Sequence, residues 1–96
     1  MEEPRDILYS HLSNLLNTRE YPKTICPSEV ARALSRSDLD LLHAESWRDT
    51  MPSIRELVWA MRDAGEVEIL QKGEVLENDV GLEQIKGPIR ARKTQP

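Results

Sequence analysis

The stretch from residue 47 to residue 70, WRDTMPSIRELVWAMRDAGEVEIL, constrains the fold of this chain more than any other part of its sequence. Apolar side chains recur in it every three or four residues, which places them on one face of a helix: Met51, Ile54, Leu57, Val58 and Met61. Pro52 fits only the first turn of a helix, because proline lacks a backbone donor. A helix over 51–64 is therefore predicted to begin near Met51, with Thr50 or Asp49 as its cap.

This helix is predicted to lead directly into a strand. Gly65 can take the left-handed conformation that closes a helix. Residues 66–70 follow with apolar and charged side chains in alternation, which is typical of a half-buried strand. A second alternating segment follows Gly87 and Pro88, and we expect the two segments to be antiparallel partners, with Val67 and Ile69 beside Ile89 and Ala91.

Two helices are predicted before this unit. Residues 3–18 carry an apolar stripe on one helical face, formed by Ile7, Leu8, Leu12, Leu15 and Leu16. A polar loop and at most a short strand over 24–26 follow it. Pro27 then opens a helix of barely two turns, whose narrow apolar face is formed by Val30, Ala31 and Leu34.

The remaining segments are predicted to be mostly irregular. Residues 35–46 indicate a loop that holds one helical turn capped by Ser37, with its leucines tucked under the domain: Leu39, Leu41 and Leu42. Residues 71–73 form a turn signal. Residues 74–86 lack a clear hydrophobic period and predict a long loop with a helical turn near Leu82.

The length of 96 residues predicts a single domain over 1–96, with a core over about 4–92 and a disordered tail over 93–96. No apolar run approaches the ~20 residues of a membrane span, and the first five residues do not resemble a signal peptide, so we expect a cytoplasmic protein without membrane contact. The single cysteine, Cys26, excludes an internal disulfide and is predicted to be a small buried side chain.

The order of the predicted elements is helix, short strand, short helix, helix, strand, loop, strand. This order predicts a mainly α fold with a small β wing (α+β), namely a winged helix-turn-helix with three main helices and a short antiparallel sheet. The chain also resembles the family named domain of unknown function 3253, at residues 26–31 (CPSEVA), 47–49 with 51–52, 71–73 and 87–90. The resemblance implies a winged-helix fold and brings no established activity, cofactor or site.

Residues that could support catalysis or metal binding are few and scattered. The only histidines, His11 and His43, lie on a helix flank and in a loop, with no nucleophile motif beside them. Together with Cys26 they have no chelating spacing. The glycines stand singly, so no phosphate-binding loop is present. We therefore predict that the protein is not an enzyme and holds no metal or cofactor.

Basic side chains on the third main helix are one candidate site. The positions of Arg55, Trp59 and Arg62 fall together on a helical wheel, beside the apolar face. In a winged helix-turn-helix this helix enters the major groove, where arginines meet phosphates or guanine edges. The ordinary interpretation is that the arginines are solvated and that Trp59 is a half-buried residue packed by Arg55 or under the wing.

The predicted wing carries a second group of bases. Arg90 and Arg92 lie in a run from Lys86 to Lys93 that contains no acid, and Lys72 lies at the turn of the same ribbon. They could bind a phosphate backbone. Alternatively, Arg90 and Arg92 could form cross-strand ion pairs with the acids of the neighbouring strand, Glu66 and Glu68.

These patterns predict a small non-enzymatic winged-helix protein that acts as a nucleic-acid-binding or regulatory module. The net charge of −4 and the pI near 5.2 predict that binding to duplex DNA is weak and electrostatic. About five or six bases could face one duplex, which corresponds to a slope of log affinity against log salt near −4 to −5. The alternative is a protein–protein interaction domain that uses the third helix and the wing without nucleic acid.

Overall fold

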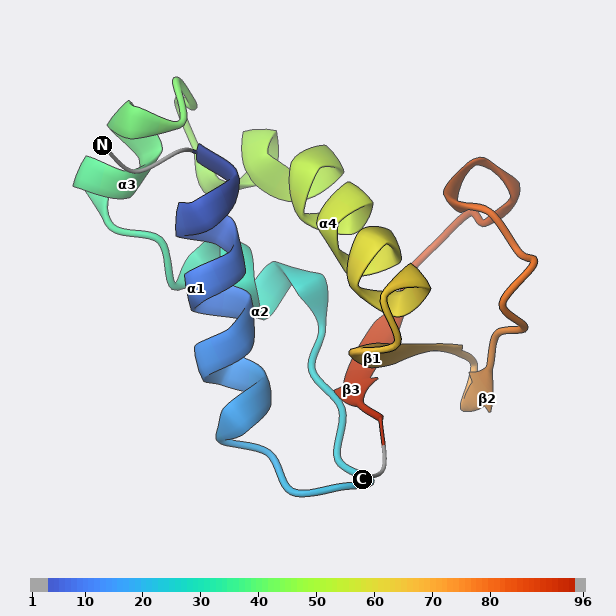
Figure 1. The fold of residues 1–96 in the computed structure, drawn as a ribbon. Coiled ribbons are helices and arrows are strands. Elements are labelled where there is room, and N and C mark those ends of the chain that lie inside the picture. The colour runs from blue at the N-terminus through green and yellow to red at the C-terminus, as the bar shows by residue number, and fades with distance from the viewer. Residues whose placement is uncertain (1–3, 95–96) are drawn as a thin grey trace.

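The computed structural model describes residues 4–94, which form an α+β fold with four α-helices and a small antiparallel sheet (Figure 1). In Figure 1 the helices lie on one side of the molecule and the sheet on the other. The elements follow in the order α1 (Pro4–Asn17), α2 (Pro27–Arg32), α3 (Arg36–Leu41), the 3₁₀ turn η1 (Trp47–Thr50), α4 (Met51–Asp63), β1 (Val67–Gln71), β2 (Glu74–Val75), the 3₁₀ turn η2 (Leu82–Gln84) and β3 (Arg90–Lys93).

The sheet has the strand order β2-β1-β3, and both pairs are antiparallel. The predicted pairing of the two alternating segments is confirmed, since Ile69 lies opposite Ala91. The predicted register is wrong at its end, because Val67 lies opposite Lys93 and Ile89 precedes β3. Ile25 adds one further bridge to Ala91 on the other edge of β3, which confirms the short extended segment before α2.

A two-residue turn joins β1 to β2, and the prediction missed this hairpin. Lys72 and Gly73 have φ of 53° and 81°. Positive φ at both central residues defines the turn whose twist matches that of the flanking strands. The long loop predicted over 74–86 is therefore wrong for Glu74 and Val75. We call residues 76–89 the wing loop, and the helical turn predicted near Leu82 is confirmed within it as η2.

The segment between α2 and α4 is more helical than predicted. It contains α3, whose first backbone groups are satisfied by a reciprocal pair: the Asp38 amide donates to Ser35 Oγ at 3.0 Å, and the Ser35 amide donates to the Asp38 carboxylate at 3.0 Å. The cap is Ser35, so the prediction of Ser37 is wrong. Leu39 is buried as predicted, whereas Leu41 is 59% exposed and does not tuck under the domain.

The start of α4 also differs in detail from the prediction. The Thr50 hydroxyl donates to the Trp47 carbonyl at 2.6 Å, and the Asp49 carboxylate accepts from the amides of Glu45 and Ser46. Thr50 occupies the N-cap position of α4 as predicted, but its side chain makes no cap hydrogen bond to α4, and both side chains stabilise η1 instead. The predicted end is confirmed, because Gly65 follows α4 with φ of 80°.

The core lies between the helices and one face of the sheet. Its fully buried large side chains come from α1, α2, α4 and β1 and from the segments before α2 and β3: Leu12, Ile25, Val30, Ile54, Val58, Ile69 and Ile89. At the end of the chain, Lys93 belongs to β3 and the Thr94 hydroxyl donates to the Gly65 carbonyl at 2.9 Å. The tail predicted from residue 93 is therefore wrong for these two residues, and the rest of it lies outside the described residues.

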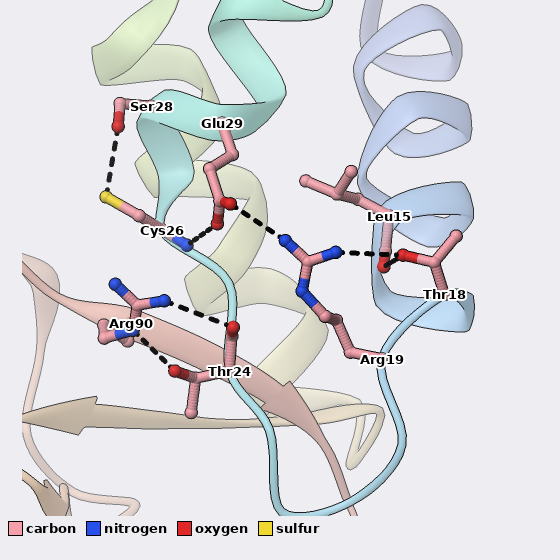
Figure 2. Close-up of polar contacts among 8 residues, drawn as sticks. All are labelled: Leu15, Thr18, Arg19, Thr24, Cys26, Ser28, Glu29 and Arg90. Carbon is pink, nitrogen blue, oxygen red and sulfur yellow. Dashed lines mark hydrogen bonds and ion pairs between the residues drawn. The ribbon is translucent and has the colours of Figure 1, made fainter.

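Cys26 is only partly buried, so the prediction of a buried side chain is wrong. It occupies the position immediately before α2, and its amide donates to the Glu29 carboxylate at 2.6 Å (Figure 2). The same carboxylate group accepts from Arg19 at 2.9 Å, which connects the end of α1 to the start of α2. The Cys26 thiol lies 3.2 Å from the Ser28 hydroxyl. Its position is set by the cap of α2.

Candidate functional site

A pocket of about 540 Å³ lies between the β1–β2 turn, the start of β3 and the start of α2. We call it the hairpin pocket. Three of its lining residues are bases: Lys72, Lys86 and Arg90. Within the part of the chain that the structure describes, no acidic residue lines it. The other lining residues are Thr24, Cys26, Leu70, Gln71, Gly73, Gly87, Pro88 and Ile89.

Hydrogen bonds to neighbouring segments fix the walls of this pocket. Arg90 Nε donates to Thr24 Oγ1 at 2.5 Å and Nη2 donates to the Thr24 carbonyl at 3.2 Å, so the guanidinium is held against the strand before α2 (Figure 2). Gln71 Nε2 donates to the Lys86 carbonyl at 2.8 Å, which holds the end of the wing loop against β1. The pocket therefore has a defined shape.

Arg55 does not line the hairpin pocket but contacts one of its lining residues. Its guanidinium donates to the Gly87 carbonyl at 3.2 Å. Gly87 lines the pocket, so this bond brings the predicted helix arginine close to the predicted wing bases. We use the name basic rim for the three lining bases together with Arg55, which contacts the lining through Gly87: Arg55, Lys72, Lys86 and Arg90.

Trp59 and Arg62 do not reach this surface. Trp59 is 6% exposed and its Nε1 donates to the Val80 carbonyl at 3.0 Å, whereas Arg62 donates to the same carbonyl at 2.6 Å. Both side chains are covered by the wing loop. The expectation that Arg62 faces solvent is wrong. Trp59 was expected to be half-buried and packed by Arg55 or under the wing. Both contacts form, since Arg55 Cζ lies 6.0 Å from the ring centroid and Nε1 donates to the wing loop, but the side chain is fully rather than half buried.

The solvent-facing side of α4 is acidic. Its exposed residues are Pro52, Ser53, Glu56 and Asp63, so it carries two acids and no base. The arginines of α4 lie on its flank beneath the wing loop, where Arg55 and Arg62 donate to carbonyls of the loop. The exposed side of α4 therefore repels phosphate groups.

Arg92 forms one of the predicted cross-strand ion pairs. Its Nε donates to the Glu68 carboxylate at 3.0 Å, and its guanidinium lies 4.7 Å from the centroid of the Tyr21 ring. Glu66 instead accepts from the Tyr9 hydroxyl at 2.7 Å, and this hydrogen bond raises the pKa of Tyr9. The prediction of cross-strand ion pairs is right for Arg92 with Glu68. It is wrong for Arg90 and Glu66, because Arg90 donates to Thr24 and Glu66 accepts from Tyr9.

The candidate site predicted from the sequence left out several basic residues. Lys86 lines the hairpin pocket, and its place in the acid-free run before Gly87 and Pro88 was the signal that could have found it. Trp47 has two guanidinium groups near its ring, with Arg32 Cζ at 5.0 Å and Arg48 Cζ at 4.6 Å from the centroid. No sequence pattern pointed to this stack, because Arg32 comes from a different helix.

A second pocket, of about 390 Å³, lies beside the start of α1 and the exposed side of α4. Its lining combines one base, Arg5, with His43 and two acids, Asp49 and Glu56. Its acids outnumber its base, so this pocket does not favour an anion. It contrasts with the hairpin pocket, whose charged lining residues are all basic.

The two histidines contact different parts of the molecule. His11 Nε2 lies 3.0 Å from the Asp38 carboxylate, a pair that connects α1 to α3, and His43 is exposed beside the second pocket. Over residues 4–94 the acids, histidines and cysteine form no group of three or more that could hold a metal ion. None of the helices described is long and apolar enough to cross a membrane.

The chain is a small α+β protein with a pocket lined by basic residues beside its β1–β2 turn. Over residues 5–94 the chain matches the family described as "Protein of unknown function (DUF3253)", and it belongs to this family. Among curated proteins, none matches the chain.

Proposed function

We propose that the protein is a non-enzymatic winged helix-turn-helix module that binds nucleic acid through the basic rim. In this arrangement α2 and α4 form the helix-turn-helix, with α3 and η1 between them, and the hairpin with its wing loop forms the wing. The bridge from Ile25 to β3 supports this assignment, because a strand before the second helix commonly completes the sheet of a winged helix.

One observation supports nucleic acid most strongly: the basic rim gathers positive charge around a pocket without acids, in a chain whose net charge is −4. Phosphate groups are attracted to such a local excess even when the whole molecule is acidic. The acidic face of α4 argues that the helix does not lie deep in the major groove. We infer that the hairpin contacts the phosphate backbone and that sequence readout is slight.

A salt titration of duplex binding tests this proposal. The rim presents about four bases, and each neutralised phosphate contributes ~0.9, so log affinity should fall with log salt at a slope of about −3 to −4. The slope is smaller than the sequence predicted, because Arg62 is buried and Arg92 is paired with Glu68. Fluorescence anisotropy with a labelled duplex at low salt measures it. Absence of binding at about 100 μM protein would overturn the proposal.

The acidic face of α4 favours a second candidate function, a protein-interaction domain. Glu56 and Asp63 are exposed on this face, and Glu56 also lines the second pocket. A partner with a basic helix or loop would complement these charges. Substitution of Glu56 and Asp63 by Gln and Asn should abolish partner binding under this proposal, whereas it should strengthen duplex binding under the first.

A further inference from the structure

We propose that the hairpin pocket is a binding site for a phosphate monoester, carried either by the 5′ end of a nucleic-acid strand or by a free nucleotide. The site is more specific than a surface that follows the backbone of a duplex. For a strand end the inference rests on the proposed function, and for a free nucleotide it stands by itself.

The size and shape of the pocket support this class of ligand. Its volume of about 540 Å³ falls within the range of small-molecule sites, about 300–1,000 Å³. Leu70, Pro88 and Ile89 supply an apolar part of its lining, and the bases stand around it. Small-molecule sites commonly combine an apolar lining with a few polar groups that fix the orientation of the ligand.

The charge of the pocket matches a phosphate monoester better than a diester. A monoester carries close to two negative charges at neutral pH, whereas each backbone diester carries one. Lys72, Lys86 and Arg90 supply three positive charges, and the described lining contains no carboxylate to compete for them. A terminal phosphate can also enter a concave site, which an internal diester within a duplex cannot do without distortion of the strand.

The position of Arg90 is preorganised for this task. Two of its nitrogens, Nε and Nη2, donate to Thr24, so the side chain is already ordered before a ligand arrives (Figure 2). Its Nη1 makes no hydrogen bond to the residues drawn in Figure 2, and it remains for an acceptor. A guanidinium held in place loses less conformational entropy on binding and gives charge-assisted hydrogen bonds to phosphate oxygens.

Two matched pairs of probes test the site. The first compares one duplex with a 5′-phosphate and the same duplex with a 5′-hydroxyl by fluorescence anisotropy. The second compares AMP with adenosine by the amide chemical shifts of Gln71, Gly73 and Gly87. We expect the phosphorylated member of at least one pair to bind about tenfold more tightly or better, since hydrogen bonds to charged groups contribute about that much.

Three variants assign the effect to the pocket. Lys86→Gln should reduce the preference for the phosphorylated probe by about tenfold. Lys72→Asn should do the same without loss of fold, because asparagine followed by glycine suits the two-residue turn, where Lys72 has φ of 53°. Arg5→Gln removes the same charge beside the second pocket and should leave the preference unchanged.

The outcomes separate this site from the proposed function. A preference for AMP over adenosine, lost in Lys86→Gln, with no duplex binding, supports a free nucleotide as the ligand and overturns the nucleic-acid proposal. A preference for the 5′-phosphorylated duplex that is lost in the same variant supports a strand end. Equal binding of both duplexes, with no response to AMP, overturns the phosphate site and leaves the proposed function standing. Equal loss of the preference in Arg5→Gln also overturns the site.

Discussion

Arg62 is a buried cation that holds the wing loop on α4. Its side chain is 6% exposed, and its Nη1 donates to the carbonyls of Val80 and Glu77 at 2.6 and 3.4 Å. The only carboxylate paired with it in the described structure belongs to Asp63, which is 65% exposed. Trp59 donates to the same Val80 carbonyl. One loop carbonyl therefore accepts from two side chains of α4, which concentrates the attachment of the loop at one point.

Replacement of Arg62 by Met should loosen the wing loop. Met keeps much of the apolar packing against Trp59, but it leaves the Glu77 carbonyl without its donor and the Val80 carbonyl with Trp59 as its remaining donor, at a cost of about 1–3 kcal/mol. Urea denaturation should show this loss, and hydrogen exchange should show faster exchange of amides in residues 76–85. Arg55→Met is the control, because Arg55 bonds only the Gly87 carbonyl at the rim. Unchanged exchange in Arg62→Met would contradict the role of Arg62.

Asp38 makes the stability of the folded protein depend on pH in the acidic range. The hydrogen bond from the Ser35 amide lowers the pKa of Asp38 below its ordinary value of 3.8; burial opposes this shift without reversing it, and the Ser35 hydroxyl and His11 lower the pKa further. The carboxylate therefore stabilises the folded state at pH above 3.8. This stability is lost as the pH falls through the lower pKa of the folded state.

The Asp38→Asn variant should lack this component. It should be less stable than the original protein at pH 7, by about 0.5–2 kcal/mol for a weakened cap, and the difference should shrink as the pH falls below 3.8. Urea denaturation between pH 2 and pH 7 measures it. Asp40→Asn, in the same helix but with an exposed carboxylate paired with Arg36, serves as the control. A difference independent of pH would refute the linkage.

Helix α4 presents three sides, and the sequence could predict only one of them. Its apolar side follows from the spacing of Ile54, Leu57 and Val58, because a core face leaves a periodic pattern. The side beneath the wing loop could not be predicted from the spacing, since Arg62 looks like an ordinary solvated arginine until the loop that covers it is placed. The exposed acidic side was visible in the sequence, but its meaning depended on where the arginines lay.

The missed elements share one cause, which is that short-range hydrogen bonds form them. Helix α3 is only six residues long and its apolar residues follow no clean period, so Ser35 and Asp38 define it through their reciprocal bonds. Strand β2 is two residues long and depends on the left-handed turn at Lys72 and Gly73. The turn signal at residues 71–73 was found, but lysine is not typical of this two-residue turn, so the sequence did not predict the tight hairpin with β2.

The whole fold is closed by its last strand. β3 lies between β1 and the bridge at Ile25, so the C-terminal strand of the described chain is flanked on both sides. Ile25 and Ala91 exchange both backbone hydrogen bonds, at 2.7 and 2.8 Å. Ile89 and Ala91 are each 1% exposed in the core. The core is therefore completed only when the end of the chain is in place, and the basic rim is completed with it because Arg90 belongs to the same strand.

Removal of this strand should abolish cooperative folding. A chain of residues 1–88 loses Ile89, whose full burial contributes about 1.5–3 kcal/mol, and also Ala91 and every backbone bond of β3. Small domains are stable by only about 5–15 kcal/mol, so several such losses together exceed what a core of this size can absorb. The truncated chain should show poor NMR dispersion and no cooperative urea transition, whereas a chain of residues 1–94 should unfold like the full protein. A cooperative transition in the shorter chain would mean that the helices form a stable core without β3. The part of the basic rim on β3 would then not be needed for folding.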